Sequence, residues 1–204
     1  MPRTGARGGP QTRARIAEAA AGLFLERGYD NVTVAEVARA AGVSSVTVFN
    51  HFPRKEDLFL DRGEEAARLL RAAVRDRAPG VDVRTSLRDT VGRLAAARHP
   101  LSGLDDRSIP FFRTVAGSPA LIARAREIAA GLQRDLEDEL DRDPAFAGDA
   151  ALLAAFFVAG YGAVLTRAAR RLTAGEPPAE VIPDHRAHLA RLFDALDHGL
   201  TPRA

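Results

Sequence analysis

The side chains best suited to chemistry gather in one short segment, residues 44–52, where hydroxyl, amide, imidazole and aromatic groups occur close together. At helical spacing Val48 and Phe52 fall on an inner side, where they can lock the segment in place. The outer side is then left with Ser45, Val46, Thr47, Phe49, Asn50 and His51. Such groups offer hydrogen bonds and apolar contacts to another molecule. We therefore expect a contact surface in this segment.

The rest of the sequence contains little that indicates an enzyme. The sequence contains no Gly-x-Ser-x-Gly, Walker or Gly-x-Gly-x-x-Gly motif, and Gly160-Tyr161-Gly162 lacks the third glycine. His185 and His188 are three residues apart on one helical face, as metal ligands can be, but no Glu-x-x-His partners accompany them. A helical-bundle enzyme or metal protein built on these histidines is the alternative. We expect no enzyme activity, no cofactor and no metal.

The composition is typical of a soluble globular protein of one or two domains, with 204 residues, 46% hydrophobic and 27% charged. The absence of cysteine excludes disulfides and thiolate sites, so a reducing compartment is expected. The first twenty residues lack the apolar stretch of a signal peptide. The longest uncharged run, residues 150–166, falls short of the roughly 18 apolar residues that a membrane span needs. We expect a cytoplasmic protein with no membrane partner.

The positive charge lies at the N-terminal end. Residues 1–57 contain eight Lys/Arg and six Asp/Glu, and residues 58–204 contain 21 of each, so the net charge of +2 belongs to the first quarter. Residues 1–11, rich in Gly, Pro and Arg, are expected to form a disordered basic arm. Six acids fall within residues 135–143, where we expect a solvated helix face rather than a cation site.

Apolar residues recur at helical spacing nearly throughout and strand patterns are missing, so the sequence predicts an all-α fold. A first helix carries Ile16 and Phe24 inward and ends at Gly28, beyond which Tyr29 can fold back on Phe24. Longer helices are predicted at residues 55–77, 85–98, 119–141, 148–172 and 184–198. A broken helix is expected within the proline-bearing loop 99–118.

Two short helices joined by a tight turn are predicted between residues 33 and 52. Thr33 can cap the first while Glu36 reaches back to it, which makes a capping box. Ala38 permits a close helix crossing, and Gly42 permits a positive φ in the turn. The pattern predicts a helix-turn-helix whose second helix suits the major groove of B-DNA, about 12 Å wide. An ordinary helical hairpin is the simpler alternative.

The stretch AAGVSSVTVFNHFPRKEDLF, residues 40–59, resembles the tetracycline-repressor (TetR) family of bacterial transcriptional regulators. The similarity covers about residues 12–59. It implies a three-helix DNA-binding domain, residues 12–57, followed by a helical ligand-binding and dimerisation domain, residues 58–204. It also implies a homodimeric regulator, most simply a repressor, that binds a pseudo-palindromic DNA operator and is released by a small, mostly apolar molecule.

The resemblance also implies roles for individual residues. The family's phosphate-contacting positions are occupied here by Thr33, Thr47, Asn50, His51 and Lys55, and its base-reading positions by Ser45, Val46 and Phe49. The first group can donate hydrogen bonds to phosphate oxygens. The family commonly has a small residue at Val46 and tyrosine at Phe49, so specificity should shift toward thymine methyl groups. Packing against the first helix is the alternative for Phe49, and capping of the helix end is the alternative for His51.

The dimer interface and the ligand pocket are implied for the C-terminal domain. Candidate interface residues on the last two helices are Leu152, Phe156, Gly160, Leu189, Leu192, Phe193 and Leu196. Candidate pocket residues are mostly apolar, with a few polar anchors: Leu69, Val91, Leu94, His99, Phe111, Phe112, Arg113, Ile122, Ile128, Phe157 and Tyr161. Packing within the monomer core is the alternative for both sets. A DNA-binding protein that takes no ligand would then result.

Overall fold

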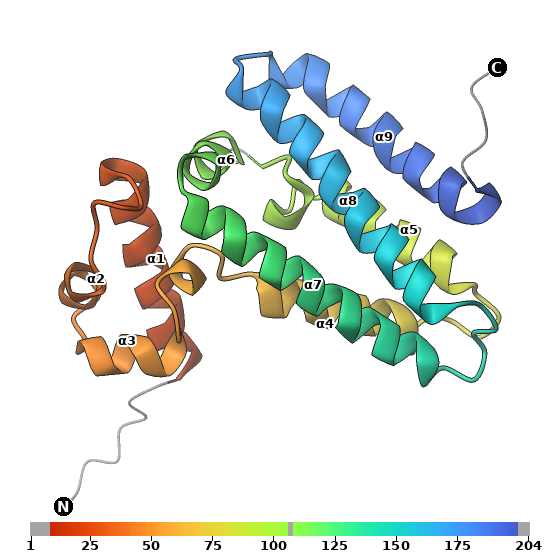
Figure 1. Cartoon of the computed structure of the whole chain (residues 1–204), viewed down its shortest axis with the longest axis horizontal. Helices are drawn as coiled ribbons and strands as arrows, with labels where there is room; N and C mark the ends of the chain where they lie inside the picture. Colours follow the sequence, from red (N-terminus) through yellow and green to blue (C-terminus); the bar gives the residue numbers. More distant parts are fainter. Residues whose placement is uncertain (1–8, 106–107, 200–204) are drawn as a thin grey trace, which may run out of the picture. The chain divides into compact units, whose positions relative to one another are not determined.

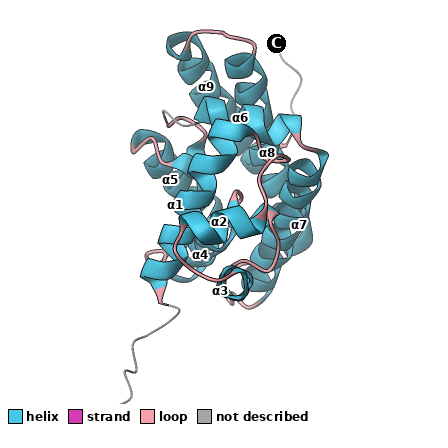
Figure 2. Ribbon diagram, turned by 90° about the vertical axis from the view of Figure 1, so that its left-hand side faces the viewer, coloured by secondary structure: helices cyan, strands magenta, loops and turns pink. Residues whose placement is uncertain are grey.

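The computed structural model describes residues 9–105 and 108–199, and these residues form helices joined by loops, with no strand among them (Figures 1 and 2). The predicted all-α fold is therefore confirmed. The α-helices are α1 (Pro10–Arg27), α2 (Val34–Ala40), α3 (Ser45–His51), α4 (Gly63–Arg75), α5 (Val83–Ala96), α6 (Ser108–Gly117), α7 (Pro119–Asp141), α8 (Ala150–Thr173) and α9 (Pro178–His198). Two 3₁₀ turns, η1 (Glu56–Leu58) and η2 (Pro100–Ser102), lie between them.

The chain divides into two compact units. Unit 1 comprises Met1–Asp61 and Arg113–Ala125, and unit 2 comprises Arg62–Phe112 and Arg126–Ala204. The domain boundaries drawn from the sequence, 12–57 and 58–204, do not anticipate that residues 113–125 belong with unit 1. Within unit 1, the Arg124 guanidinium donates to the Asp57 carboxylate at 2.7 Å. The returning segment is thus attached to unit 1 by an ion pair as well as by packing.

Local signals in unit 1 act as the sequence predicts. The φ of Gly28 is 83°, and its N–H donates to the Phe24 carbonyl at 2.9 Å. The Tyr29 ring then lies 5.1 Å from the Phe24 ring, which confirms the predicted fold-back. Together with neighbouring helices these rings close a small apolar core, whose buried members include Ile16, Ala20, Phe24, Val32, Val37, Val48, Phe52 and Leu58.

Several predicted helix ends in unit 2 are wrong. The helix predicted from residue 55 begins only at Gly63, because η1 and a turn precede it, and apolar periodicity does not separate a 3₁₀ turn from an α-helix. α6 is a continuous helix within the predicted loop. α9 begins six residues early, at Pro178, and it contains Pro183. Proline suits the first helical position, and one near the helix start removes only one backbone hydrogen bond.

Three ion pairs join α4 and the residues just after it to α7 and the residues just after it. They are Arg71–Asp135, Arg75–Glu139 and Arg77–Asp143. Glu139 is buried and accepts two hydrogen bonds from the Arg75 guanidinium. Three of the six acids in residues 135–143 therefore form ion pairs with arginines on or just after α4. The prediction of a solvated helix face is only partly correct.

By length and composition alone, α8 could cross a membrane. The sequence analysis predicted no such helix, because the uncharged run 150–166 is too short for a membrane span. The helix extends beyond that run to Thr173, which supplies the missing length. In unit 2 its buried residues, among them Ala154, Phe157 and Val164, join a core that also includes α5 and α9. Figure 1 shows α9 lying alongside α8. This packing accounts for the apolar character of one side of α8.

Gly160 allows α8 and α9 of the same chain to approach closely. A Cβ at Gly160 would lie 2.3 Å from Cδ1 of Leu192, whereas a Cβ at Gly162 would meet nothing within 4 Å. Gly160→Ala should lower the free energy of unfolding by about 1–2 kcal/mol because Leu192 must shift. Gly162→Ala should raise it by up to about 1 kcal/mol through helix propensity. Denaturant titrations of both variants measure this, and equal stabilisation would refute the close approach.

Candidate nucleic-acid interface

α2 and α3 form the predicted helix-turn-helix in unit 1. The Thr33 hydroxyl accepts a hydrogen bond from the Glu36 N–H at 3.3 Å, and the Glu36 carboxylate accepts one from the Thr33 N–H at 2.8 Å, so the capping box is confirmed. Gly42 has the expected positive φ of 64°. The Ser44 hydroxyl caps α3 by accepting from the Thr47 N–H at 3.1 Å. Such caps matter because each helix has only seven residues and isolated helices of that length are unstable.

α3 presents two large apolar side chains to solvent. Val46 is 69% exposed and Phe49 is 50% exposed, whereas Val48 between them is fully buried. Asn50 is also exposed, and Ser45 is half-buried on the same short helix. Burial of Val48 fixes the rotation of α3, and this rotation puts the predicted base-reading residues on accessible surface. The exposed apolar area is typical of a surface that binds another molecule.

The hydroxyls at two predicted phosphate-contact positions are already engaged within the helix caps. The Thr33 hydroxyl donates to the Glu36 carboxylate at 2.8 Å. The hydrogen bond from the Thr33 N–H, followed by this one from its hydroxyl, lowers the pKa of the Glu36 carboxyl, which stays ionised. The Thr47 hydroxyl lies 2.9 Å from the Ser44 hydroxyl. Asn50 and His51 are placed on the last turn of α3, where Asn50 is exposed and His51 half-buried.

Lys55 has an internal partner that the sequence did not predict. Its ammonium donates to the Tyr29 carbonyl at 2.7 Å and lies 4.1 Å from the centre of the Tyr29 ring. An ammonium carries three donors, so it can bind a phosphate as well. Burial, reinforced by the negative charge of Glu56, raises the pKa of the Tyr29 hydroxyl, which therefore stays neutral beneath the cation.

Part of the N-terminal positive charge is also used internally. The Arg13 guanidinium lies 4.4 Å from the centre of the Phe52 ring and donates to the Asp61 carbonyl at 3.2 Å. Most of the predicted basic arm, residues 1–8, lies outside the described residues. Residues 10 and 11 already belong to α1.

Comparison with known families identifies this helical unit. Residues 16–61 match the family model described as bacterial regulatory proteins, tetR family, and the match spans the last two thirds of α1, the helix-turn-helix and η1. Residues 16–61 therefore form an N-terminal domain of the tetR family, whose model describes regulatory proteins.

Individual relatives support the assignment over different lengths. The chain is 42% identical over 59 residues to the HTH-type transcriptional repressor AcnR of Corynebacterium glutamicum, a match that covers 28% of this chain and 31% of AcnR. It is 30% identical over 146 residues to the HTH-type transcriptional regulator TcmR of Streptomyces glaucescens, covering 63% of this chain and 64% of TcmR. The chain thus spans about a third of the length of the AcnR proteins that it matches.

Solved structures show the same fold over nearly the whole chain. The SmeT–triclosan complex has a TM-score of 0.61 at 18% identity, covering 95% of this chain and 96% of SmeT. Thermus thermophilus FadR, a TetR-family repressor in complex with lauroyl-CoA, has a TM-score of 0.54 at 24% identity, covering 94% of this chain and 96% of FadR. The helical domain that follows the helix-turn-helix therefore also has the TetR-family fold.

The predicted dimer residues fall into two groups. Leu152 and Phe156 on α8 are 53% and 61% exposed, and Ala159 and Ala163 continue an exposed row at spacings of three and four. The row is a continuous apolar stripe on one face of α8. These residues are free to contact a second copy of the chain.

The second group lies inside the same chain. Leu189 and Phe193 are buried in the core of unit 2, where a partner subunit cannot reach them. Gly160 faces Leu192 of its own chain, and both Leu192 and Leu196 are half-buried. Helical periodicity predicted one apolar face of α9 for the four α9 residues of this group, but it does not distinguish intrachain from interchain packing.

Three predicted pocket residues lie together in the main core of unit 2. Val91 and Phe157 are buried there, and the Phe157 and Tyr161 rings stack with centroids 6.1 Å apart. The Tyr161 hydroxyl donates to the Leu101 carbonyl at 2.9 Å. Burial raises the pKa of this hydroxyl to about 12, so it remains a neutral donor. These side chains fill space in the monomer.

Two other predicted pocket residues lie against the start of α4. His99 caps η2 by accepting from the Leu101 N–H at 3.3 Å, and its Nε2 lies 3.4 Å from the Glu65 carboxylate. Ile128 is close to Gly63, since a Cβ there would lie 3.3 Å from its side chain. Both residues are therefore engaged in local structure.

The remaining pocket residues are divided between the two units. Arg113 and Ile122 belong to unit 1. In unit 2, the rings of Phe111 and Phe112 lie 5.7 Å apart, and Leu94 is half-buried on α5. The residues predicted as one pocket thus occupy several separate environments.

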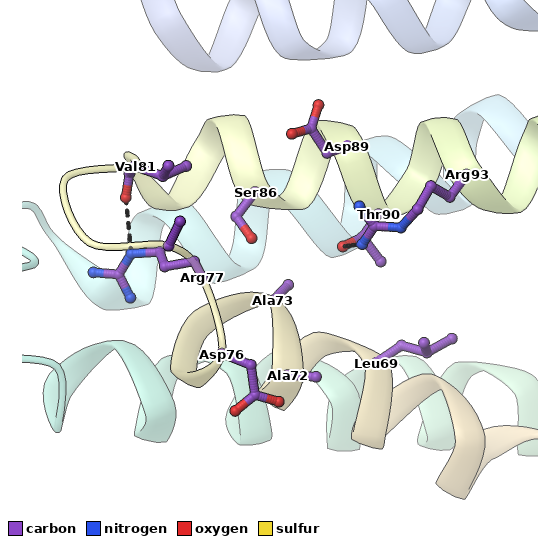
Figure 3. A pocket seen from close by; sticks show the side chains of 11 residues that line it. Leu69, Ala72, Ala73, Asp76, Arg77, Val81, Ser86, Asp89, Thr90 and Arg93 are labelled. Atoms are coloured by element: carbon purple, nitrogen blue, oxygen red, sulfur yellow. Dashed lines mark hydrogen bonds between the residues drawn. The ribbon is translucent and has the colours of Figure 1, made fainter.

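A groove of about 310 Å³ runs between α4 and α5 in unit 2 (Figure 3). Leu69 is the one predicted pocket residue that lines it. The opposite wall is polar, with the Arg93 guanidinium donating to the Thr90 hydroxyl at 2.9 Å and with Asp89 nearby. The mixed charges of this groove do not match the mostly apolar pocket that the resemblance implied.

The two histidines of the metal hypothesis are in different environments. His185 is 2% exposed and neither ring nitrogen has a hydrogen-bond partner, whereas the His188 Nδ1 lies 2.8 Å from the Asp184 carbonyl. Burial, followed by the charge of His188, lowers the pKa of His185, so its ring is neutral near neutral pH. In the part of the chain that the structure describes, no three His, Asp or Glu side chains are grouped to hold a metal ion.

Proposed function

We propose that this TetR-family protein is a transcriptional regulator, most simply a repressor, which binds a pseudo-palindromic DNA operator as a homodimer and leaves it when a small, mostly apolar molecule binds. It would work in the cytoplasm without a membrane partner. The single observation that carries the proposal is the exposed face of α3, where Val46 and Phe49 project from a capped, rigidly seated helix.

The chemistry of this face suits base edges in the major groove. Val46 and Phe49 offer apolar contact, most naturally to thymine methyl groups, and Ser45 can donate to or accept from a base. The outer polar residues of the helix-turn-helix then fix its register on the phosphates. For Thr33, phosphate contact requires the hydroxyl proton to turn away from the Glu36 carboxylate, whereas the Thr47 hydroxyl can accept from Ser44 and donate to a phosphate. Asn50 and Lys55 keep donors available, so we assign them the stronger phosphate contacts.

Lys55→Ala should weaken binding to every duplex and lower the slope of log affinity against log salt by about one, because one phosphate contact is lost. It should also destabilise unit 1 by about 1–2 kcal/mol, since its ammonium bonds the Tyr29 carbonyl and covers the Tyr29 ring. Anisotropy titrations at several salt concentrations and thermal denaturation measure the two effects. An unchanged salt slope in a folded variant would refute the phosphate assignment.

A homodimer would use the exposed stripe on α8. A two-fold interface is self-complementary, and Leu152, Phe156, Ala159 and Ala163 form an apolar row with small residues that permit close helix approach. Two such subunits would present two α3 helices to successive major grooves, which explains why the operator should be pseudo-palindromic.

Phe156→Arg should raise the dimer dissociation constant roughly 100-fold, because it places a charge in the centre of the apolar row. Its exposure means that folding should be retained. Light scattering across a concentration series measures the oligomeric state. Leu25→Arg, on the exposed side of α1, is the matched control and should remain dimeric. A dimer of unchanged affinity in Phe156→Arg would place the interface elsewhere.

Small-molecule release is supported by two structural neighbours, SmeT in complex with triclosan and FadR in complex with lauroyl-CoA. A ligand that binds the DNA-incompetent arrangement more tightly would shift the population away from the operator, by no more than the difference between its two affinities.

Selection of bound duplexes from fragmented genomic DNA tests the proposal. We expect enrichment of a two-fold-symmetric motif with thymines at the positions read by α3. A motif without symmetry would contradict the dimeric mode of binding, and no enrichment at all would contradict the function.

A further inference from the structure

The buried ring of His185 on α9 is an unsatisfied polar group. It is 2% exposed, and both ring nitrogens lack a hydrogen-bond partner. Leaving such a group unpaired destabilises the folded protein, and folded proteins rarely do so without a reason. No part of the DNA-binding surface or of the exposed α8 stripe makes use of this side chain.

Helical spacing along α9 places the ring between two apolar clusters of unit 2. One turn before it on α9, Val181 packs in an apolar cluster with Ala168 and Leu172 of α8. Ile109 and Phe112 of α6 cover this cluster. One turn after His185, Leu189 belongs to the main core. The imidazole thus interrupts an apolar row at the junction of two apolar clusters.

The charges near this ring favour a neutral partner. Asp184, the adjacent carboxylate, is already bonded to Arg171 at 2.7 Å and to Arg167 at 3.2 Å. Arg186 and His188 place positive charge nearby and oppose protonation of the ring. A neutral imidazole has one N–H donor and one acceptor nitrogen. A hydroxyl group satisfies either nitrogen without bringing a buried charge into an apolar cluster.

The α6 side of the cluster can adapt to a guest. Ile109 and Phe112 are only partly buried, in contrast to Val181 and Leu172. A guest that enters this cluster from the α6 side must displace the half-buried Phe112 ring, which lies beside Gly103.

We propose that His185 is the polar anchor of an effector site between α6, α8 and α9, and that the effector is a neutral apolar molecule bearing a hydroxyl group that hydrogen-bonds the imidazole. The site rests on the proposed ligand-responsive function and gives it a chemical class of ligand. It also explains the position of the unpaired ring, whose cost in the free protein is recovered when the hydroxyl binds.

The test uses the full-length protein and two probes of nearly the same shape, p-cresol and p-xylene, which differ by a hydroxyl in place of a methyl group. The variants are His185→Leu and, as a matched control one turn along α9, His188→Leu. Calorimetric titration should give p-cresol an affinity at least tenfold higher for the wild type than for His185→Leu, with His188→Leu like the wild type. p-Xylene should bind the wild type and His185→Leu equally.

Two further measurements separate recognition from a loss of folding. His185→Leu should melt at a higher temperature than the wild type without probe, because an unpaired polar group has been replaced by an apolar one. The ¹⁵N shifts of the His185 ring should change when p-cresol is added and stay unchanged with p-xylene. Equal affinity of p-cresol for the wild type and His185→Leu, or ring nitrogens that do not respond to it, would overturn the proposal. An ordered water that remains the only hydrogen-bond partner of the ring after p-cresol is added would also overturn the proposal.

Binding of random duplex DNA by the same preparations, without probe, keeps the two proposals apart. The wild type and His185→Leu should bind DNA equally, because residue 185 lies in unit 2 and α3 lies in unit 1. Failure of both to bind DNA would count against the regulatory function alone. Failure of p-cresol to distinguish them would count against the effector site alone.

Discussion

Val46→Asp should lower affinity for operator DNA roughly 100-fold, because a carboxylate replaces an apolar base contact beside the phosphate backbone. The protein should fold normally. Val46 is 69% exposed, and it lies in the first turn of α3, where a negative charge interacts favourably with the helix dipole. Anisotropy titration against a selected operator measures the loss, and circular dichroism with thermal denaturation checks the fold.

Two controls make this result specific. Val46→Thr keeps the shape and adds a hydroxyl, so it should change the preferred bases more than the affinity. Leu25→Asp adds the same charge to another exposed apolar position of unit 1, on α1, and should reduce binding far less. Equal losses in Val46→Asp and Leu25→Asp would mean that net charge, and not contact by α3, determines binding.

Arg77→Met should lower the free energy of unfolding by about 3 kcal/mol, because it leaves a buried carboxylate without its partner. The side chains of Arg77 and Asp143 are only 12% and 11% exposed. The Arg77 guanidinium also donates to the Val81 carbonyl at 3.0 Å and to the Val74 carbonyl, so it joins the end of α4 to the loop that follows and to the end of α7. Denaturant titration measures the effect.

The control for this pair is Arg142→Met. Arg142 is exposed and pairs with the equally exposed Asp138, and it also lies 3.6 Å from the buried Glu139 carboxylate. Glu139 keeps both hydrogen bonds from Arg75 when Arg142 is replaced, so stability should change by less than about 0.5 kcal/mol. Adding Asp143→Leu to Arg77→Met should restore part of the lost stability, because the unpaired charge is removed. If Arg77→Met and Arg142→Met lower the free energy of unfolding by equally small amounts, the Arg77–Asp143 pair does not behave as a buried ion pair.

The features predicted correctly from the sequence are those that depend on a few neighbouring residues. The capping box at Thr33, the stop at Gly28 and the turn at Gly42 each follow from backbone and cap requirements within five residues. The bounds of α7 are correct for the same reason, since Pro119 starts the helix and the apolar repeat runs unbroken to its end.

Features that depend on distant residues were not predictable in the same way. The Lys55 ammonium binds a carbonyl 26 residues earlier, and Arg75 pairs with Glu139 across 64 residues. Which apolar residues of α9 face their own chain also depends on how α8 packs. The unpaired ring of His185 could be found only from its surroundings, because a histidine at a helical position is compatible with a metal, a cap or a core.

Titration of a fluorescent duplex with the purified protein at low ionic strength, repeated as salt is raised, tests whether the protein binds DNA through phosphate contacts. We expect binding at about 50 mM salt and a linear fall of log affinity with log salt, with a steeper slope for the wild type than for Lys55→Ala. Absence of binding to any duplex at low salt, or affinity that is indifferent to salt, would contradict this mode of binding.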